Sequence, residues 1–309
     1  ARCVIAENCH KATIPAELVG GCDPNPAMRQ RATEVLGDYP WFETLDELLE
    51  LGIDCAIVTS PDDTHEDITC ALLEAGVAVY LEKPIAITIE GADRVLETAY
   101  RTKTPLYVGH NMRHMAVVRI LRQVVQDGLI GEVRAIWCRH FVGNGGDYYF
   151  KDWHADRSRT TGLLLQKAAH DIDVMNWLSD SVPERVVGMG DLMLYGKITG
   201  RSGQKPDVVM SDWFSFDNWP PASLTGLNPV IDVEDVSMLM MRQASGTLIS
   251  YEQCHFTPDY WRNYTVIGTE GRAENFGDGE GGVVRVWKHR SGWEPTGDIE
   301  IPIKGDAGG

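Results

Sequence analysis

Short apolar runs rich in β-branched residues alternate with amphipathic stretches from Glu17 to Gly109. This alternation is typical of βαβ units, which build a parallel sheet with helices packed on it. The predicted strands cover residues 17–22, 54–59, 77–81 and 106–109. The predicted helices lie near residues 27–36, 44–51, 64–75 and 88–102, and residues 1–12 read as the last turns of an earlier helix. The sequence therefore predicts a parallel-sheet domain over residues 1–113.

The remainder of the chain has a different pattern. A helix near 114–127 and a long strand at 132–142 lead to an aromatic loop and a strong helix over 162–178. Further strands are predicted near residues 184–194, 234–242, 247–255, 263–269 and 283–288. We expect an α/β domain over 114–309 with one large, mainly antiparallel open sheet and helices on one face. Residues 196–232, rich in Gly, Pro, Ser and Asp, form a long excursion of a kind that is usually functional or mobile.

Composition and charge narrow the class of partner. The chain has 309 residues, which exceeds the usual size of a single hydrophobic core, so two domains are expected. Its apolar fraction of 43% is ordinary for a globular protein. Its formal charge is −17 and no run of Lys or Arg reaches four, which argues against nucleic acid or an anionic membrane surface. No stretch approaches the ~18 apolar residues of a membrane span. A small, uncharged ligand is the partner that we expect.

Seven cysteines are scattered along the chain without a CxxC pair. An odd number without a regular framework favours free thiols in a reducing compartment, so we expect a cytoplasmic protein. Both ends of the sequence read as cut, since Ala1 falls inside the first predicted helix. A signal peptide upstream of Ala1 therefore stays an open alternative.

The glycine turn of a dinucleotide-binding fold is missing from its usual place. That fold opens with a strand and a GxGxxG turn feeding its first helix, and an acidic residue follows ~20 residues later. Asp23 is placed for the acidic residue if the glycines lie just before Ala1. A literal GxGxxG occurs at Gly277, Gly279 and Gly282, but an alternating strand follows it instead of a helix. We predict a β-hairpin turn there.

The tetrapeptide Leu81-Glu82-Lys83-Pro84 ends the third predicted strand. Pro84 fixes its own φ and biases Lys83 away from helix, which holds the lysine at the carboxyl edge of the sheet, where ligands bind. An isolated lysine is normally a solvated surface charge. The strand-end proline and the flanking motifs favour instead a cation that meets cofactor and substrate together.

A second polar segment, Thr59-Ser60-Pro61, ends the preceding strand, and His65 lies one turn into the helix that follows. Thr59 and Ser60 can hydrogen-bond a ribose or a diphosphate at this edge. The alternative is that these residues, or Thr64, only cap the helix. The sequence does not separate the two.

Five motifs follow one another in a fixed order along the chain. They are Cys22-Asp23-Pro24, Thr59-Ser60-Pro61 with His65, Glu82-Lys83-Pro84, Gly109-His110-Asn111-Met112-Arg113, and His170 with Asp173. Together they resemble the Gfo/Idh/MocA family of nicotinamide-dependent sugar and polyol oxidoreductases, over nearly the whole chain. The resemblance implies a Rossmann domain, a C-terminal α/β domain whose open sheet often mediates homo-dimers or homo-tetramers, and a site between the domains.

The resemblance also implies roles for single residues. Lys83 would contact the nicotinamide ribose and the substrate hydroxyl, and Arg113 would face the substrate. The predicted cofactor-binding residues are Asp23, Thr59, Ser60, His65, Glu82 and Asn111. NAD is expected because the Asp23 carboxylate can accept the ribose 2′-OH and would repel a 2′-phosphate, while Arg29 keeps NADP possible.

The second catalytic segment lies on the long predicted helix. A histidine suits the removal of an alcohol proton because its unperturbed pKa is ~6.5. A lone histidine is more often a packing residue, but the neighbouring Lys and two Asp residues, with the family match, favour His170 as the acid/base. At helical spacing Gln166 and Lys167 share its face, and Asp173, a predicted substrate ligand, extends that face by a turn.

One position departs from the family pattern. Many relatives have an aspartate four residues before the histidine, where this chain has Gln166, and glutamine cannot accept a proton at neutral pH. Lys167 takes part in catalysis if a like charge from Lys83 lowers its pKa. The other alternative is that Lys167 simply binds a sugar hydroxyl.

Residues 147–157 mix four aromatic side chains with charged groups. Such a mixture suits carbohydrate, because aromatic faces cover the apolar C–H surface of a sugar while Asp, His and Arg bind its hydroxyls. A lid or an oligomer contact is an equal alternative. Trp153 and His154 are the residues that we expect at the substrate, together with Gln166.

These inferences predict an NAD-dependent dehydrogenase of a sugar, glycoside or cyclitol hydroxyl. His170 would remove the proton and Lys83 would stabilise the developing alkoxide. A redox-neutral glycosidase or lyase that uses NAD transiently is the first alternative, and a non-catalytic nicotinamide-binding regulator the second. The Cys and His spacing shows no zinc signature, so no catalytic metal is expected.

Overall fold

The computed structural model describes residues 16–305, which form two compact units. The first unit comprises the chain up to Gly109 and also takes in Gln204–Asp212. The second comprises His110–Gly203 and the chain from Trp213 onward. The helix predicted over residues 1–12 lies outside the described residues.

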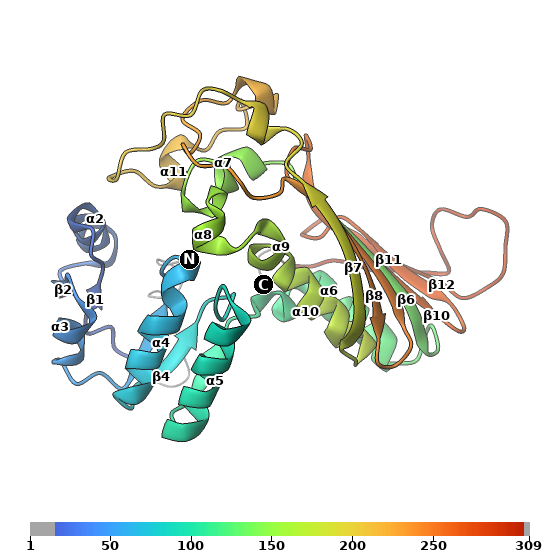
Figure 1. The fold of residues 1–309 in the computed structure, drawn as a ribbon. Helices are drawn as coiled ribbons and strands as arrows, with labels where there is room; N and C mark the ends of the chain where they lie inside the picture. The colour runs from blue at the N-terminus through green and yellow to red at the C-terminus, as the bar shows by residue number, and fades with distance from the viewer. Residues whose placement is uncertain (1–15, 306–309) are drawn as a thin grey trace. The chain divides into compact units, whose positions relative to one another are not determined.

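All strand pairs of the first unit are parallel, as the sequence predicts, but they form two small sheets (Figure 1). The first sheet consists of β1 (Gly21–Cys22) and β2 (Trp41–Phe42). The second has the order β3 (Cys55–Val58), β4 (Ala78–Leu81) and β5 (Leu106–Val108). β1 is shorter than predicted, and β2 is absent from the prediction because two residues are too few to show a pattern.

The helices of the first unit begin where the sequence predicts. They are α2 (Pro26–Leu36), α3 (Leu45–Leu49), α4 (His65–Glu74) after the 3₁₀ turn η1 (Asp62–Thr64), and α5 (Ile89–Thr102). The side chains of Asn25, Thr44 and Thr88 cap α2, α3 and α5 by accepting hydrogen bonds from backbone N–H groups. Leu72 and Leu73 of α4 are buried in one core with the inward side chains of β3 and β4.

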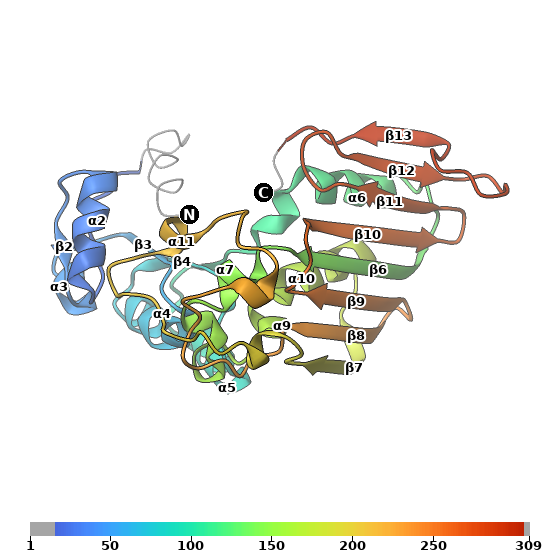
Figure 2. The same cartoon turned by 90° about the horizontal axis from the view of Figure 1, so that it is seen from above.

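One eight-stranded sheet dominates the second unit, and Figure 2 shows its strands side by side from β7 to β13. The spatial order is β13 (Ile299–Pro302), β12 (Val283–Trp287), β11 (Arg272–Phe276), β10 (Tyr260–Gly268), β6 (Val133–Val142), β9 (Leu248–Cys254), β8 (Val236–Gln243) and β7 (Pro183–Asp191). Only β6 and β9 pair in parallel among the described strands of this sheet, so the predicted mainly antiparallel sheet is confirmed.

Helices cover one face of this sheet. α6 (Ala116–Gln126) and α10 (Ala168–Ser179) contribute Val117, Leu121 and Met175 to a core shared with the inward side chains of seven strands. Along β8, Leu239 and Met241 point into this core while Met238 and Met240 are exposed. The helices on one face are therefore confirmed, and Met238 and Met240 of the opposite face are exposed.

The connecting segments contain short helices. They are η2 (Asn111–His114), α7 (Gly145–Tyr149), η3 (Trp153–Ala155), α8 (Arg157–Thr160), α9 (Leu163–Gln166), η4 (Tyr195–Lys197), α11 (Met210–Trp213) and η5 (Pro221–Ser223). The long excursion predicted over 196–232 runs between β7 and β8 and contains the last three of them. Among residues 16–305, no helix combines the length and the apolar character that a bilayer crossing requires.

The single helix predicted over 162–178 is wrong. The structure has α9 and α10, with Lys167 between them at φ −102°. The backbone N–H of Leu164 donates to Glu234 Oε1 at 2.7 Å, so the start of α9 is held by a side chain from a distant loop. Such a tertiary contact leaves no trace in the local pattern.

The literal GxGxxG is a hairpin turn, as predicted. β11 and β12 pair antiparallel with Phe276 opposite Val283, and the glycine segment joins them. Gly277 and Gly281 have φ of +80° and +87°, which residues with a Cβ rarely adopt. The strand β12 directly follows the turn, so the turn does not offer the helix N-terminus that binds a phosphate.

The substitution Gly281→Ala tests this assignment. A Cβ at Gly281 would meet nothing within 4 Å, so its cost comes from the positive φ alone. We expect the free energy of unfolding to fall by about 1 kcal/mol, with no change in NADH affinity. Gly292→Ala, which also meets nothing within 4 Å and lies outside the positive-φ region, serves as the control. Weakened NADH binding at unchanged stability would contradict the hairpin assignment.

Candidate active site

Three parallel strands of the first unit end at one edge of their sheet. Val58 lies opposite Leu81 and Leu81 opposite Val108, so the residues after them emerge together. Thr59 and Ser60 follow β3, and Glu82 and Lys83 follow β4; all four are half-buried. The backbone N–H of Glu82 still donates to Val58 O at 3.0 Å, and the Lys83–Pro84 peptide bond is cis.

His65, the first residue of α4, is buried beneath these strand ends. Its Nδ1 lies 2.7 Å from the carbonyl oxygen of Pro84, and its Nε2 lies 3.0 Å from that of Ser60. The ring thereby connects the loop after β3 with the corner after β4. These bonds give His65 a positioning role, and its contact with a cofactor stays a prediction.

The capping alternative for the segment before α4 is wrong. Thr64 occupies the N-cap position but makes no side-chain capping bond, and the 3₁₀ turn η1 has no side-chain cap either. Instead the Thr64 hydroxyl lies 2.6 Å from Ser60 Oγ and 2.7 Å from Pro61 O. The Thr64 hydroxyl therefore orders the loop after β3.

Asp23 directly follows β1, where its carboxylate oxygen Oδ1 accepts a hydrogen bond from the backbone N–H of Asn25 at 2.9 Å. Arg29 Nη1 donates to the backbone carbonyl of Asp23 at 2.6 Å, and Arg29 Nη2 lies 3.8 Å from Glu43 Oε2. The guanidinium of Arg29 is thus directed at groups of the protein itself.

The donor set at these strand ends fits a dinucleotide. A carboxylate after β1 accepts ribose hydroxyls, hydroxyls after β3 hydrogen-bond a diphosphate or ribose, and a cation after β4 stabilises negative charge on oxygen. Asp23, Ser60 and Lys83 supply these groups. They would hold NAD in this unit.

In the second unit, the structure brings together two of the predicted substrate-binding residues. Arg113 of η2 donates to the Asp173 carboxylate of α10 through two parallel bonds, Nε–Oδ2 at 2.7 Å and Nη2–Oδ1 at 2.6 Å. His110 Nδ1 lies 3.9 Å from Asp173 Oδ2. Asn111 begins η2, and His170 stands half-buried in the first turn of α10.

Lys167 lies between aromatic rings. Its Nζ is 5.7 Å from the centre of the Tyr149 ring and 6.0 Å from that of Tyr260. The rings of Tyr149 and His154 meet in a T-shaped arrangement with their centroids 5.4 Å apart, and His154 stacks on Trp153 with the centroids 3.7 Å apart. Tyr149 thus links the predicted residues of the aromatic loop to Lys167, while Gln166 is buried at the end of α9. Whether Lys167 binds or reacts stays a prediction.

Asp171, next to His170, points away from solvent and is completely buried. His140 Nδ1 and the Tyr251 hydroxyl both lie 3.0 Å from its Oδ2, and Arg262 Nε lies 3.2 Å from Oδ1. Tyr264 donates a further hydrogen bond to Oδ1. These partners stand on three strands of the sheet, so the carboxylate fastens the start of α10 to that sheet.

The charges in this cluster are settled by burial and by Arg262. Burial alone would raise the pKa of Asp171, but the neighbouring His140 and Arg262 lower it well below its usual range. Burial, reinforced by Arg262, lowers the pKa of His140 to about 3, so its imidazole is neutral at neutral pH. The result is a buried carboxylate paired with a buried guanidinium.

Comparison with known proteins decides the family. Residues 4–110 match the model of an oxidoreductase family with an NAD-binding Rossmann fold, and residues 118–274 match the GFO/IDH/MocA C-terminal domain. The chain belongs to the Gfo/Idh/MocA family. Its first unit accordingly contains the NAD-binding Rossmann domain of this family, and its second the C-terminal domain.

This chain matches only part of the length of each of its named relatives. "Putative oxidoreductase YteT" of Bacillus subtilis is 26% identical over 84% of this chain and 70% of its own length. An inositol 2-dehydrogenase of Rhizobium meliloti is 29% identical over 62% of this chain and 56% of its own length. A solved levoglucosan dehydrogenase, complexed with NADH and levoglucosan, has a TM-score of 0.73 at 17% identity over 92% of this chain and 71% of that one. That last likeness shows the fold.

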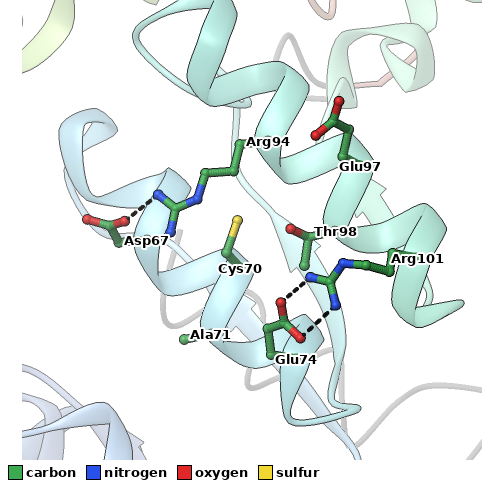
Figure 3. Close-up of a pocket in the computed structure, with 8 residues that line it drawn as sticks. All are labelled: Asp67, Cys70, Ala71, Glu74, Arg94, Glu97, Thr98 and Arg101. Carbon is green, nitrogen blue, oxygen red and sulfur yellow. Dashed lines mark hydrogen bonds and ion pairs between the residues drawn. The ribbon is translucent and has the colours of Figure 1, made fainter.

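A hollow lies along helices α4 and α5 of the first unit of this family member (Figure 3). It measures about 400 Å³ and is lined by Asp67, Cys70, Ala71, Glu74, Arg94, Glu97, Thr98 and Arg101. Arg94 donates to Glu66 at 2.7 Å and to Asp67 at 2.9 Å, and Arg101 pairs with Glu74. These ion pairs join the two helices, and the hollow does not include the strand ends.

Several residues of the site escape the sequence patterns. His110 and Tyr149 lie inside segments that the sequence singles out, but the sequence does not reveal what their side chains contact. Tyr260 and Arg262 belong to β10 but lie before the strand predicted over 263–269, so the sequence gives no signal for them. Within residues 16–305, no three His, Cys, Asp or Glu side chains are arranged to hold a metal ion.

The substitution Asp171→Asn tests the fastening of α10. It leaves the buried Arg262 with only the more distant Asp278, 3.9 Å from its Nη1, so we expect the free energy of unfolding to fall by about 3 kcal/mol at neutral pH. Since the pKa of Asp171 is lowered in the folded protein, its contribution is present above the unfolded pKa of ~3.9 and lost as the pH falls below it. The difference from the parent, measured by urea unfolding, should therefore narrow in acid.

Asp180→Asn is the matched control for this measurement. Asp180 pairs with Arg122 at 3.3 Å but its side chain is 78% exposed, so we expect a change of at most about 0.5 kcal/mol. Equal effects of the two substitutions would contradict the role of Asp171.

Proposed function

We propose that this chain is an NAD-dependent dehydrogenase that oxidises a hydroxyl carbon of a sugar, glycoside or cyclitol. The observation that carries the proposal is Lys83, half-buried at the end of a strand in an NAD-binding Rossmann domain. Inositol 2-dehydrogenase and levoglucosan dehydrogenase, to which the chain is similar, support this substrate class.

The residues of the chain divide the chemistry between them. NAD, when bound, supplies the acceptor for a hydride. Lys83 would hold the substrate oxygen and stabilise the negative charge that develops on it. His170 would take the hydroxyl proton, and the Asp171 cluster would keep it in place by fastening α10. Lys167, with Tyr149 and Tyr260 around it, would bind a neighbouring hydroxyl.

NAD is proposed over NADP. The Asp23 carboxylate suits a ribose 2′-OH and repels a 2′-phosphate. Arg29, the residue that favours NADP in the sequence, donates to the Asp23 carbonyl and lies near Glu43. Its guanidinium is therefore held away from a role as a phosphate ligand.

The substitutions Lys83→Met and His170→Asn test the proposal. In the full-length protein, supplied with NAD and a panel of glycosides, free sugars and inositols, we expect the parent to accumulate NADH with at least one compound. Each substitution should lower kcat by about 10²–10⁴-fold, because each removes a group that acts on the reacting oxygen. NADH binding, followed by fluorescence, should change far less than kcat.

Matched controls are Lys288→Met and His289→Asn, which remove exposed residues of the same types and should leave kcat unchanged. Release of free sugar without NADH accumulation would contradict net oxidation and favour the redox-neutral cleavage. NADH binding without turnover of any compound would favour the non-catalytic regulator.

We further propose that the uncovered face of the large sheet packs against a second copy of the chain. Val187, Met240, Ser250 and Trp137 form a row across four neighbouring strands. The side chains of Val187, Met240 and Trp137 are 63%, 65% and 53% exposed. An apolar face of this kind on a sheet marks an interaction site. A homo-dimer or homo-tetramer would cover it.

Met240→Glu tests this interface because it places a charge in the middle of the apolar row. By light scattering after gel filtration, we expect the parent to be a dimer or tetramer and the variant to dissociate. Tyr100→Glu, at an 89% exposed position of α5, should leave the mass unchanged. A monomeric parent would contradict the proposal.

A cytoplasmic location also stays a proposal. It is supported by the free thiols Cys22, Cys55, Cys70, Cys138 and Cys254.

A further inference from the structure

A short piece of the long excursion belongs to the first unit. Between β7 and β8 the chain leaves the second unit at Gly203, contributes Gln204–Asp212 to the first unit, and returns at Trp213. We call residues 204–212 the clasp. Its contacts are made with helix α2, about 180 residues earlier in the sequence.

The side chains of Arg31 and Asn25 hold the clasp on α2. Arg31 Nη2 donates to Ser211 Oγ at 3.3 Å. Arg31 Nη1 donates to Asp212 Oδ2 at 2.9 Å and Arg31 Nη2 to Oδ1 at 3.1 Å, a two-pronged pairing of guanidinium and carboxylate. Asn25 Nδ2 donates to Pro206 O at 2.8 Å. The clasp is ordered from within as well, because Asp212 Oδ2 accepts from the backbone N–H of Val209 at 2.8 Å.

Asn25 joins the clasp to the proposed cofactor site. Its backbone N–H donates to the Asp23 carboxylate, its side-chain oxygen caps α2 through the N–H of Ala27 at 3.0 Å, and its side-chain nitrogen reaches the clasp. The acidic residue at this point of a dinucleotide-binding fold receives the adenosine ribose. Asn25 therefore connects the clasp directly to Asp23, at the adenosine end of that site.

We propose that the clasp is a part of the cofactor site, closing its adenosine end, and that the Arg31–Asp212 ion pair slows the release of NADH. The inference rests on the proposed NAD site at Asp23. It assigns a function to a loop of the C-terminal half that lies outside the five motifs of the sequence.

The properties of the Arg31–Asp212 ion pair suit a contact that holds the clasp reversibly. Its side chains are 39% and 34% exposed, so its contribution to global stability is small and is screened by salt. The bond from Arg31 lowers the pKa of Asp212, so the pair stays charged throughout the neutral range. Breaking it should free the clasp without unfolding the unit.

The experiment measures NADH dissociation from the full-length protein by stopped-flow fluorescence. Arg31→Gln and Asp212→Asn should each raise the dissociation rate constant about two- to five-fold at low salt. The charge-swapped double variant Arg31→Asp with Asp212→Arg should restore slow release. Raising the salt to 1 M should speed release from the parent and erase its difference from the single variants.

The control is a second exposed ion pair of the same unit, Arg101 with Glu74 (Figure 3). Arg101→Gln and Glu74→Gln should leave NADH dissociation unchanged, with a similarly small effect on thermal stability. Unchanged release in Arg31→Gln and Asp212→Asn, or no recovery on charge swapping, would overturn the clasp. If these variants release NADH as the parent does but Asp23→Ala weakens NADH binding, the proposed cofactor site is supported and only the clasp proposal is overturned. Absence of NADH binding in the parent would overturn both proposals.

Discussion

A carboxylate buried without any exposure has to be compensated, and the arrangement of the second unit follows from how Asp171 is compensated. Its ion pair with Arg262 and its bonds from His140, Tyr251 and Tyr264 fasten the first turn of α10 to the sheet. His170 is the preceding residue in that turn. The position of the proposed proton acceptor thus depends on a cluster that touches no substrate.

In the first unit, a buried side chain fixes the candidate site by contacting backbone carbonyl groups. The strands β3 and β4 end in loops whose carbonyls at Ser60 and Pro84 both face the buried ring of His65. A loop at the end of a strand would otherwise be among the more mobile parts of a fold. The ring of His65 therefore restrains the backbone of the corner that holds Lys83.

Local sequence patterns predict most of this architecture because the strands and helices are apolar at regular spacing. The parallel strands near Lys83, the mainly antiparallel sheet and the hairpin at Gly277 all follow from such patterns. β11 and β13 escape them: β11 buries Asn275 beside Ala273 and β13 has only four residues. The separation of α9 from α10 at Lys167 escapes as well, and α9 begins at a contact between the Leu164 N–H and Glu234, 70 residues away in the sequence.

The site is predictable to a smaller extent than the fold. Strand-end motifs and the helix with His170 suggest the candidate residues, since their residue types and settings are local properties. Their partners are not local. Asp171 meets side chains 31 to 93 residues away, and Arg31 meets Asp212 at a separation of 181 residues. Only the folded chain reveals these pairs.

The central claim is that Lys83 and His170 act on one substrate hydroxyl, and a structure of the full-length protein with NADH and a turned-over sugar or polyol tests it most directly. The account predicts the Lys83 ammonium and the His170 imidazole both within about 3 Å of the same hydroxyl oxygen. A bound substrate whose reacting oxygen contacts neither residue, or a cofactor placed away from the ends of β3 and β4, would contradict it.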